Sequence, residues 1–396
     1  MRVYADNAAT TKLSPAAKEA MLPYFDEIYG NPSTLYTLGQ EAAEHLLACR
    51  SEIAQLIGAA DPREIVFTSG GSEADNQAII SAARNGARKG KKHLISTKFE
   101  HHAVLHTLDK LRKEGFDVTL LDVHENGVVR VEDVAAAIRD DTALVSVMFA
   151  NNEIGTIQPI EAIGAVCHER GVLFHTDAVQ AAGHVKIDVN AMHIDLLSLS
   201  AHKFHGPKGV GMLYARRGII LTNLIEGGAQ ERGKRGGTEN VPGIAAMAAA
   251  LTEACANMNE NTKKVTALRD KLIDGISKIP HCALNGAREP RLPGNVNFCF
   301  EGIEGESLLL LLDAKGISAS SGSACTSGSL DPSHVLLAIG RPHEVAHGSL
   351  RLTICEDNTE EEIDYILAEL PPIVDDLRNM SPVWKDLMSG KRQFTL

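Results

Sequence analysis

Residues 171–203, GVLFHTDAVQAAGHVKIDVNAMHIDLLSLSAHK, decide the fold class of this chain. They contain two short apolar runs, VLFHT and DLLSLS, and each run ends in polar residues. Asp177 follows the first run, and His202 and Lys203 follow the second. Short apolar runs bounded in this way predict buried strands. Polar residues that follow buried strands predict a ligand site at one edge of a sheet.

The same alternation extends upstream. The runs EIVFTSG, HLIST, DVTLLDV and TALVSVMFA lie between residues 64 and 150, and helical patterns separate them. This alternation is typical of βα units around a mainly parallel sheet that is buried on both faces. After about residue 255 the pattern changes to a charged helix, a segment rich in proline and glycine, and the strand NVNFCF. We therefore predict an α/β protein of two domains, with a boundary between residues 255 and 260.

Composition and charge disfavour several classes of partner, although local basic patches such as Arg232-Gly-Lys-Arg235 leave anionic partners open. The 396 residues carry a net charge of −12, which disfavours nucleic acid and anionic membrane surfaces as partners. The longest apolar run, residues 244–251, is far shorter than the roughly 20 residues that a bilayer requires. The N-terminal residues resemble no secretory signal, and the seven cysteines include no CxxC pair. We expect a cytoplasmic protein with reduced thiols. Its histidines form no HExxH motif, so we expect no metal site.

Lys203 is the first candidate catalytic residue. It lies at a strand end next to His202, where burial and cationic neighbours favour the uncharged amine, a nucleophile suited to a Schiff base. The alternative from these residues alone is a solvated loop lysine.

Gly70-Gly71-Ser72-Glu73 joins a predicted strand to a helix. The free N–H groups and the dipole of a helix start favour a phosphate, and Ser72 adds a hydroxyl donor. The stretch matches neither the GxGxxG nor the GxxxxGK[ST] pattern, so it predicts neither a dinucleotide fold nor a P-loop. The alternative is an ordinary capped turn.

Asp177, Gln180 and His101 also follow predicted strands. A carboxylate at a sheet edge matches a cation such as a pyridinium nitrogen, although Asp177 also suits a helix N-cap. Gln180 could donate to a ring oxygen. His101 could stack on a planar ring or carry a proton, whereas most single histidines are structural.

Two further candidates lie near the C-terminus. Cys325 lies in residues 318–330, a run of small residues without periodicity, so we predict an exposed, reactive thiol on a mobile loop. Arg351, in the pattern SLRLTI, could direct a planar guanidinium at a carboxylate, and the alternative is a surface strand arginine.

The sequence as a whole resembles the pyridoxal phosphate-dependent cysteine desulfurases of the NifS/IscS group. The resemblance covers nearly the full length and rests on the set and order of DNAATT, GNPS, TSGGSEADN, EHHAVL, NNEIGT, HTDAVQ, SxHKFHGPKG, ERGKRGGTEN and SSGSACTSGS. It implies the fold type I of pyridoxal phosphate enzymes: a large domain with a mainly parallel seven-stranded sheet, residues 14–257, and a smaller α+β domain, residues 1–13 and 258–396. The loop around Cys325 resembles the long form of the family.

The resemblance also implies a role for each site residue. Lys203 would hold the cofactor as an internal aldimine, Asp177 would pair with the pyridine nitrogen, and His101 would stack on the ring. The expected cofactor contacts are Gly71, Ser72, His101, Asn152, Asp177, Gln180, Ser200, His202, Lys203 and Thr238. Thr238 would reach the phosphate of the neighbouring subunit, which implies a homodimer. Arg351, with Asn31, would bind the substrate carboxylate, and Cys325 would accept the sulfur.

The implied reaction converts L-cysteine to L-alanine and leaves a persulfide on Cys325. The sulfur would then pass to a protein acceptor such as an iron–sulfur scaffold. Two alternatives are a selenocysteine lyase or another enzyme of the same fold type, and, from another class, a non-catalytic subunit for sulfur relay or assembly. The chain departs from the family at Tyr36, where a histidine is frequent, and at Cys355, where a glycine is frequent. Cys355 is either a second reactive thiol or a buried strand cysteine.

Overall fold

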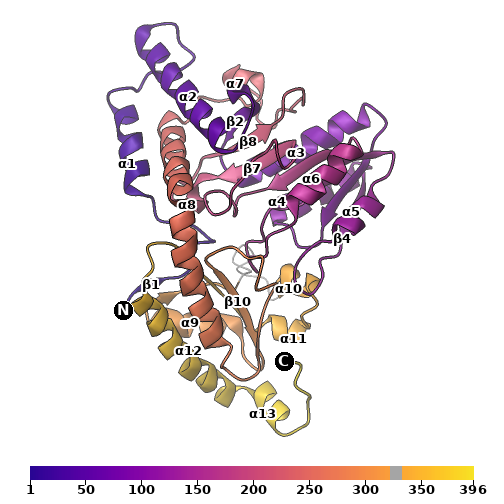
Figure 1. Cartoon of the computed structure of the whole chain (residues 1–396), viewed down its shortest axis with the longest axis vertical. Coiled ribbons are helices and arrows are strands. Elements are labelled where there is room, and N and C mark those ends of the chain that lie inside the picture. Colours follow the sequence, from indigo (N-terminus) through magenta and orange to yellow (C-terminus); the bar gives the residue numbers. More distant parts are fainter. Residues whose placement is uncertain (322–331) are drawn as a thin grey trace.

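Seven strands form the central sheet of the larger body in the computed structural model, which describes residues 1–321 and 332–396 (Figure 1). Along the sheet their order is β2-β8-β7-β6-β5-β3-β4. All neighbours pair in parallel except β8, which is antiparallel to both β2 and β7. The predicted mainly parallel seven-stranded sheet is therefore confirmed. The strands are β2 (Ile65–Thr68), β3 (His93–Thr97), β4 (Asp117–Leu121), β5 (Thr142–Ser146), β6 (Leu173–Asp177), β7 (Leu196–Ser200) and β8 (Gly211–Ala215).

Helices cover both faces of the sheet. Because successive side chains of a strand point to opposite faces, neighbouring residues of one strand pack into different hydrophobic clusters. Leu196 packs into one hydrophobic cluster, with α3 (Gly71–Ala87) and α4 (His102–Lys113). Leu197, its neighbour on β7, packs into a second cluster on the other face. That cluster includes residues of α2 (Thr37–Leu56), α5 (Val131–Ala137) and α6 (Ile160–Glu169). The continuous apolar runs of these strands, such as DLLSLS, thus reflect burial by helices on both faces of the sheet.

A smaller body contains the C-terminal third of the described chain. Its antiparallel sheet has the order β12-β10-β9, and β1 pairs in parallel with β11 beside it. Strand β10 is the predicted run NVNFCF. The elements are β1 (Val3–Tyr4), β9 (Cys282–Leu284), β10 (Asn295–Phe300), β11 (Ile317–Ser318), β12 (Ser349–Thr353), α9 (Gly305–Ala314), α10 (His334–Ala338), α11 (His343–Ala346), α12 (Glu360–Met380) and α13 (Pro382–Met388).

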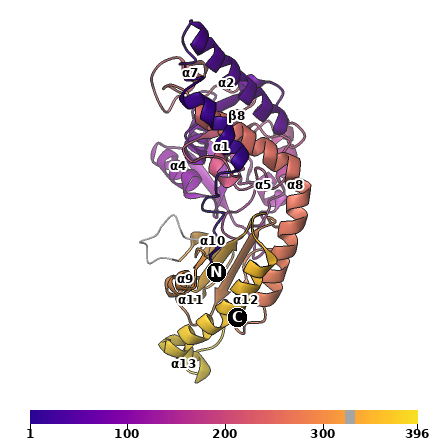
Figure 2. The ribbon, with the colours of Figure 1, turned by 90° about the vertical axis from the view of Figure 1, so that its left-hand side faces the viewer.

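Helix α8 (Val241–Ile276) connects the two bodies, and both views show it running lengthwise from the larger body into the smaller one (Figures 1 and 2). Ile244 and Leu251, in its first half, pack in the larger body, and Leu268 and Leu272, in its second half, pack in the smaller one. By length and composition α8 could span a membrane, but half of its most apolar window is buried inside the protein, as in a core helix. The predicted domain boundary falls inside this continuous helix and stays a prediction.

The remaining elements are short. They are α1 (Pro15–Met21), α7 (Gln230–Gly233) and the 3-10 helices η1 (Leu22–Phe25), η2 (Pro62–Glu64) and η3 (Ala201–Lys203). Helix α1 begins with Ser14 as its N-cap, which accepts a hydrogen bond from the backbone N–H of Ala17, and Pro15 lies in its first turn.

Candidate active site

Lys203 lies on η3, directly after β7, at the carboxyl edge of the central sheet. Its Nζ donates hydrogen bonds to the carbonyl oxygens of Ala8, at 2.6 Å, and Ala9, at 2.9 Å. The N-terminal arm is fixed there by a second contact, because the backbone N–H of Thr11 donates to the carbonyl of His202 at 2.9 Å. The amine is thus positioned by backbone oxygens and is not a solvated loop lysine.

Asp177 ends β6, the strand next to β7, and its side chain is buried. Its Oδ1 accepts a hydrogen bond from the backbone N–H of Val179 at 2.9 Å. Burial raises the pKa of Asp177 to about 6, against the lowering influence of that hydrogen bond and of Lys203. A buried carboxylate in this state favours a cationic partner, which a pyridinium nitrogen provides.

Behind Asp177 is a buried polar network that the sequence did not reveal. The ring nitrogens of His175 lie 2.8 Å from Ser146 Oγ and 3.0 Å from Ser198 Oγ, and its Nε2 lies 3.6 Å from Asp75 Oδ1. Burial lowers the pKa of His175 to about 3, so its imidazole is neutral. Burial, with the charge of Asp177 second, raises the pKa of Asp75 well above its ordinary value. Burial thus favours a proton on Asp75, whereas the hydrogen bond from Val179 and the charge of Lys203 favour the charged form of Asp177.

His101 is the N-cap of α4, and its Nδ1 accepts a hydrogen bond from the backbone N–H of Ala103 at 3.1 Å. A neutral ring that accepts at Nδ1 carries its proton at Nε2. Burial, followed by the positive charge of Lys203, lowers the pKa of His101 to about 4. The neutral imidazole of His101 is therefore close enough to the Lys203 amine for the charge of that amine to affect its pKa.

The predicted phosphate cup is formed by the start of α3 and the end of β7. A Cβ on Gly70 would lie 3.6 Å from Ser200 Oγ. A Cβ on Gly71 would lie 2.6 Å from a methyl group of Val179 and 3.6 Å from Ser200 Cβ. A side chain at Gly71 would therefore clash at this helix start, where free backbone N–H groups favour an anion. Ser72 is exposed at the same helix start, so two hydroxyl groups adjoin the cup.

Arg351 lies on β12, in the smaller body, and only 3% of its side chain is exposed. It donates to Asp6 Oδ1 at 2.8 Å and to the backbone oxygen of Asn152 at 3.0 Å. Its Nε is buried without a hydrogen-bond partner among the described residues. The alternative of a surface strand arginine is therefore wrong. The guanidinium therefore has one buried N–H that none of the described residues accepts.

Other predicted cofactor residues lie around the same edge of the sheet. Gln180 donates to the carbonyl of Ala8 at 3.0 Å, the oxygen that also accepts from Lys203. His202 Nδ1 lies 3.2 Å from Thr10 Oγ1, and burial, with the charges of Lys203 and Lys208, lowers the pKa of His202 to about 4. The N-terminal arm was not predicted from the sequence as a part of this site. The motif DNAATT was its only signal.

The other predicted site residues stand apart or lie outside the described chain. Asn31 is exposed in the loop before α2, and its Oδ1 accepts a hydrogen bond from the backbone N–H of Ser33 at 3.0 Å. Thr238 is exposed in the loop before α8. Their assigned roles stay predictions. Cys325 and the predicted mobile loop around it fall largely within residues 322–331, outside the described residues.

The donor set fits pyridoxal phosphate. An amine, a buried carboxylate, a neutral imidazole and a glycine-lined helix start match the aldehyde, the ring nitrogen, the ring face and the phosphate of that cofactor in turn. The four features come from four segments that are distant in sequence and meet at one sheet edge. If the Gly71 stretch were only a capped turn, or Asp177 only an N-cap, the other three features would have no reason to lie at the same sheet edge.

Comparisons with known proteins show the family of the chain. The model of the aminotransferase class-V family matches residues 3–366. A cysteine desulfurase IscS of Clostridium botulinum (strain Hall) is 56% identical over 395 residues, 99% of each chain. One of Methanosarcina thermophila is 54% identical over 381 residues, 96% of this chain and 94% of the relative.

Solved structures show the same architecture. A NifS-like protein superposes with a TM-score of 0.89 at 39% identity and covers 95% of this chain and all of its own. The structure of SspA in complex with cysteine superposes with a TM-score of 0.79 at 36% identity over 89% of this chain and 98% of that one.

Proposed function

Because the chain belongs to the class-V aminotransferase family, and within it to the cysteine desulfurases, we propose that it converts L-cysteine to L-alanine and supplies the sulfur for iron–sulfur cluster assembly. The observation that carries the proposal is the meeting of Lys203, Asp177, His101 and the Gly71 cup at one sheet edge. This set supports the pyridoxal phosphate chemistry that the reaction needs.

Bound pyridoxal phosphate supplies an electron sink that stabilises negative charge at the substrate α-carbon. Lys203 would hold its aldehyde carbon, Asp177 its ring nitrogen and His101 its ring face. Gly71, Ser72, Ser200 and His202 would hold its phosphate. Gln180 and Asn152 would contact its ring oxygen.

The side chains of this site then bind the substrate and move its protons. Arg351 binds the carboxylate of cysteine, which competes with Asp6 for the guanidinium, and Asn31 assists. The amine of Lys203, oriented by the carbonyls of Ala8 and Ala9, removes the α-proton and returns a proton. His101, neutral and protonated at Nε2, donates or accepts the proton of the sulfur side.

Cys325 takes the sulfur. Its thiolate attacks the sulfur of the substrate, the carbon–sulfur bond breaks, and the carbon takes up a proton to give alanine. The sulfur remains on Cys325 as a persulfide, so no external oxidant or reductant is needed. A protein acceptor such as an iron–sulfur scaffold then receives it. We place the enzyme in the cytoplasm.

We also infer a homodimer with shared active sites. Thr238 is exposed on the loop that connects α7 to α8, so it is accessible to a second copy. It would contribute its hydroxyl to the phosphate of the neighbouring site, as the resemblance implies.

The decisive experiment is incubation of the protein with pyridoxal phosphate and cysteine, followed by mass measurement of the Cys325 peptide. We expect one added sulfur atom on this peptide and formation of alanine. The Lys203→Ala variant should lose alanine formation while part of the cofactor stays bound through Asp177 and the glycine cup. Undiminished alanine formation by this variant would refute the assignment.

A second variant separates the alternatives. Cys325→Ala should lose sulfur transfer to a protein acceptor. A selenocysteine lyase or a related enzyme would keep full turnover without Cys325. A non-catalytic subunit would form no alanine and show no yellow absorbance of bound cofactor.

A further inference from the structure

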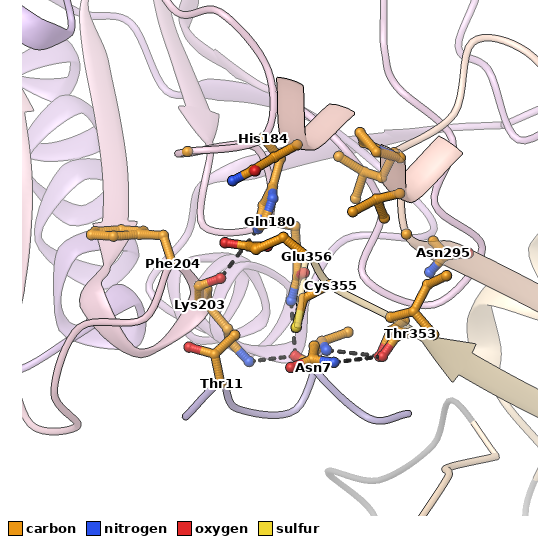
Figure 3. Close-up of a pocket in the computed structure, with 18 of the residues that line it drawn as sticks. Asn7, Thr11, Gln180, His184, Lys203, Phe204, Asn295, Thr353, Cys355 and Glu356 are labelled. Carbon is orange, nitrogen blue, oxygen red and sulfur yellow. Dashed lines mark hydrogen bonds between the residues drawn. The ribbon is translucent and has the colours of Figure 1, made fainter. Parts of the chain in front are cut away.

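A second cluster of reactive side chains lies next to Lys203, on the side of the smaller body. His205 follows η3, and Cys355 and Glu356 follow β12. The ligand atoms of these three side chains all lie within 4.8 Å of one another. The mechanism above uses none of them. Figure 3 shows Cys355 and Glu356 in the pocket that they share with His184 and Gln180.

The imidazole of His205 is oriented for a ligand by its own contacts. Its Nδ1 lies 2.9 Å from the carbonyl oxygen of Lys12, which can only accept, so Nδ1 carries a proton. Its Nε2 is buried and lies 3.4 Å from Glu356 Oε1, close enough for an ion pair when the ring is protonated, but it has no hydrogen bond of good geometry among the described residues. A metal-binding histidine has this arrangement, with one nitrogen fixed by a carbonyl and the other directed at the ion.

The backbone around His205 is also held in an unusual conformation. Its φ angle is +64°, a left-handed value that is uncommon for residues other than glycine. The backbone N–H of His205 donates to Thr11 Oγ1 at 2.8 Å, which holds this conformation in place. Strained residues of this kind are concentrated at functional sites.

We propose that His205 Nε2, Cys355 Sγ and the carboxylate of Glu356 form a binding site for Zn²⁺. A thiolate, an imidazole and a carboxylate are the three ligand types that zinc prefers, and together they contribute two negative charges that balance the ion. The adjoining cavity of about 60 Å³ has room for a water molecule as the fourth ligand. No sequence motif predicts this site, because His205 lies far from Cys355 and Glu356 in the chain.

The site would connect the two bodies. His205 belongs to the loop that carries Lys203, and Cys355 and Glu356 follow the strand that carries Arg351. A bound ion would therefore link the cofactor side of the active site to the substrate side. Because the unfolded chain lacks this site, zinc should raise the melting temperature.

The test uses the full-length protein with bound cofactor and the Cys325→Ser substitution, which removes the sulfur-accepting thiol as a competing ligand. We expect this protein, after treatment with a chelator, to bind one Zn²⁺ per chain in a competition titration. Adding Cys355→Ser or Glu356→Gln should weaken binding by at least about 10-fold, because each removes a ligand. Cys282→Ser, at a half-buried thiol on β9, is the matched control and should bind like the parent.

Cobalt gives an independent readout. Co²⁺ bound to the parent should show the visible bands of tetrahedral coordination and a charge-transfer band from thiolate to cobalt, and Cys355→Ser should lose the charge-transfer band. The melting temperature of the parent should rise with zinc, and that of Glu356→Gln should rise less at the same zinc concentration. Absence of stoichiometric zinc binding by the parent, or binding unaffected by both substitutions, would overturn the proposal.

Discussion

At the scale of single residues, burial determines which acidic side chains of the site carry a charge. Asp75 and Asp177 occupy the same dry region, and burial raises the pKa of both. One proton on Asp75 removes the conflict between them. The sequence predicted Asp177 from its place after an apolar run. It gave no signal for Asp75, because a single polar residue inside a helical pattern does not show whether its side chain is buried.

The charge of Asp177 should be essential to turnover. Asp177→Asn keeps the shape and the hydrogen bond from Val179 but cannot balance a cationic ring nitrogen. We expect the rate of alanine formation to fall about 100-fold or more, as it does when other enzymes lose a buried electrostatic partner. Steady-state assays with saturating cofactor measure this effect. Asp140→Asn, at an exposed position, is the control, and equal rates for the two variants would contradict the role of Asp177.

Glu100 should make folding stability depend on pH. It is fully buried, and burial raises its pKa to about 8, although hydrogen bonds from Thr97 and Met148 lower it. The folded state thus keeps a proton that the unfolded state releases near its ordinary pKa of 4.5. The stability from this group is present at low pH and is lost as the pH rises toward 8.

Glu100→Gln tests this, because glutamine can accept the same hydrogen bonds and cannot ionise. Its melting temperature should fall less than that of the native chain between pH 5 and pH 8. Glu114→Gln, at an exposed position, should behave like the native chain. Parallel melting curves for the native chain and Glu100→Gln would refute the assignment.

At the scale of elements, the site depends on strand ends that meet a helix start. The βα pattern predicted the carboxyl edge of the sheet, and with it Lys203, Asp177 and the cup at Gly71. It did not predict β8, whose antiparallel pairing between β2 and β7 is determined by contacts distant in sequence. The N-terminal arm was missed for the same reason, since no local pattern links Ala8 to Lys203.

The cup at the start of α3 should be sensitive to a single added methyl group. In Gly71→Ala the new Cβ would lie 2.6 Å from a methyl group of Val179. Overpacking of this kind costs about 1–3 kcal/mol, so we expect the affinity for pyridoxal phosphate to fall about 10-fold. Titration of the apoenzyme, followed by the absorbance of the bound cofactor, gives the affinity.

The double variant Gly71→Ala with Val179→Ala removes the clashing methyl group and should recover part of that affinity. An affinity for pyridoxal phosphate that is unchanged in Gly71→Ala would show that this helix start does not hold the phosphate.

At the scale of the whole molecule, α8 transmits stability between the two bodies. Its two halves belong to two hydrophobic clusters, and Asn257 lies exposed between them. Proline inside a helix costs about 3 kcal/mol or more, because it removes a hydrogen bond and clashes with the preceding turn. Asn257→Pro should therefore split unfolding into two transitions in a calorimetric scan.

Asn257→Ala preserves the helix and should melt in one transition, like the native chain. The outcome also tests the predicted domain boundary at residues 257/258. A single transition for Asn257→Pro at the native temperature would mean that the two bodies do not depend on a continuous α8.

The N-terminal arm also affects the order in which the protein can be completed during synthesis. Residues 3–9 are made before the central sheet, yet β1 pairs with β11 in the smaller body, and Asp6 pairs with Arg351. The central sheet has all of its strands once Ala215 is made, whereas the arm waits for partners that emerge much later. The surroundings of Lys203 are therefore completed only after Arg351 has been made, when the smaller body closes on a much earlier segment of the chain.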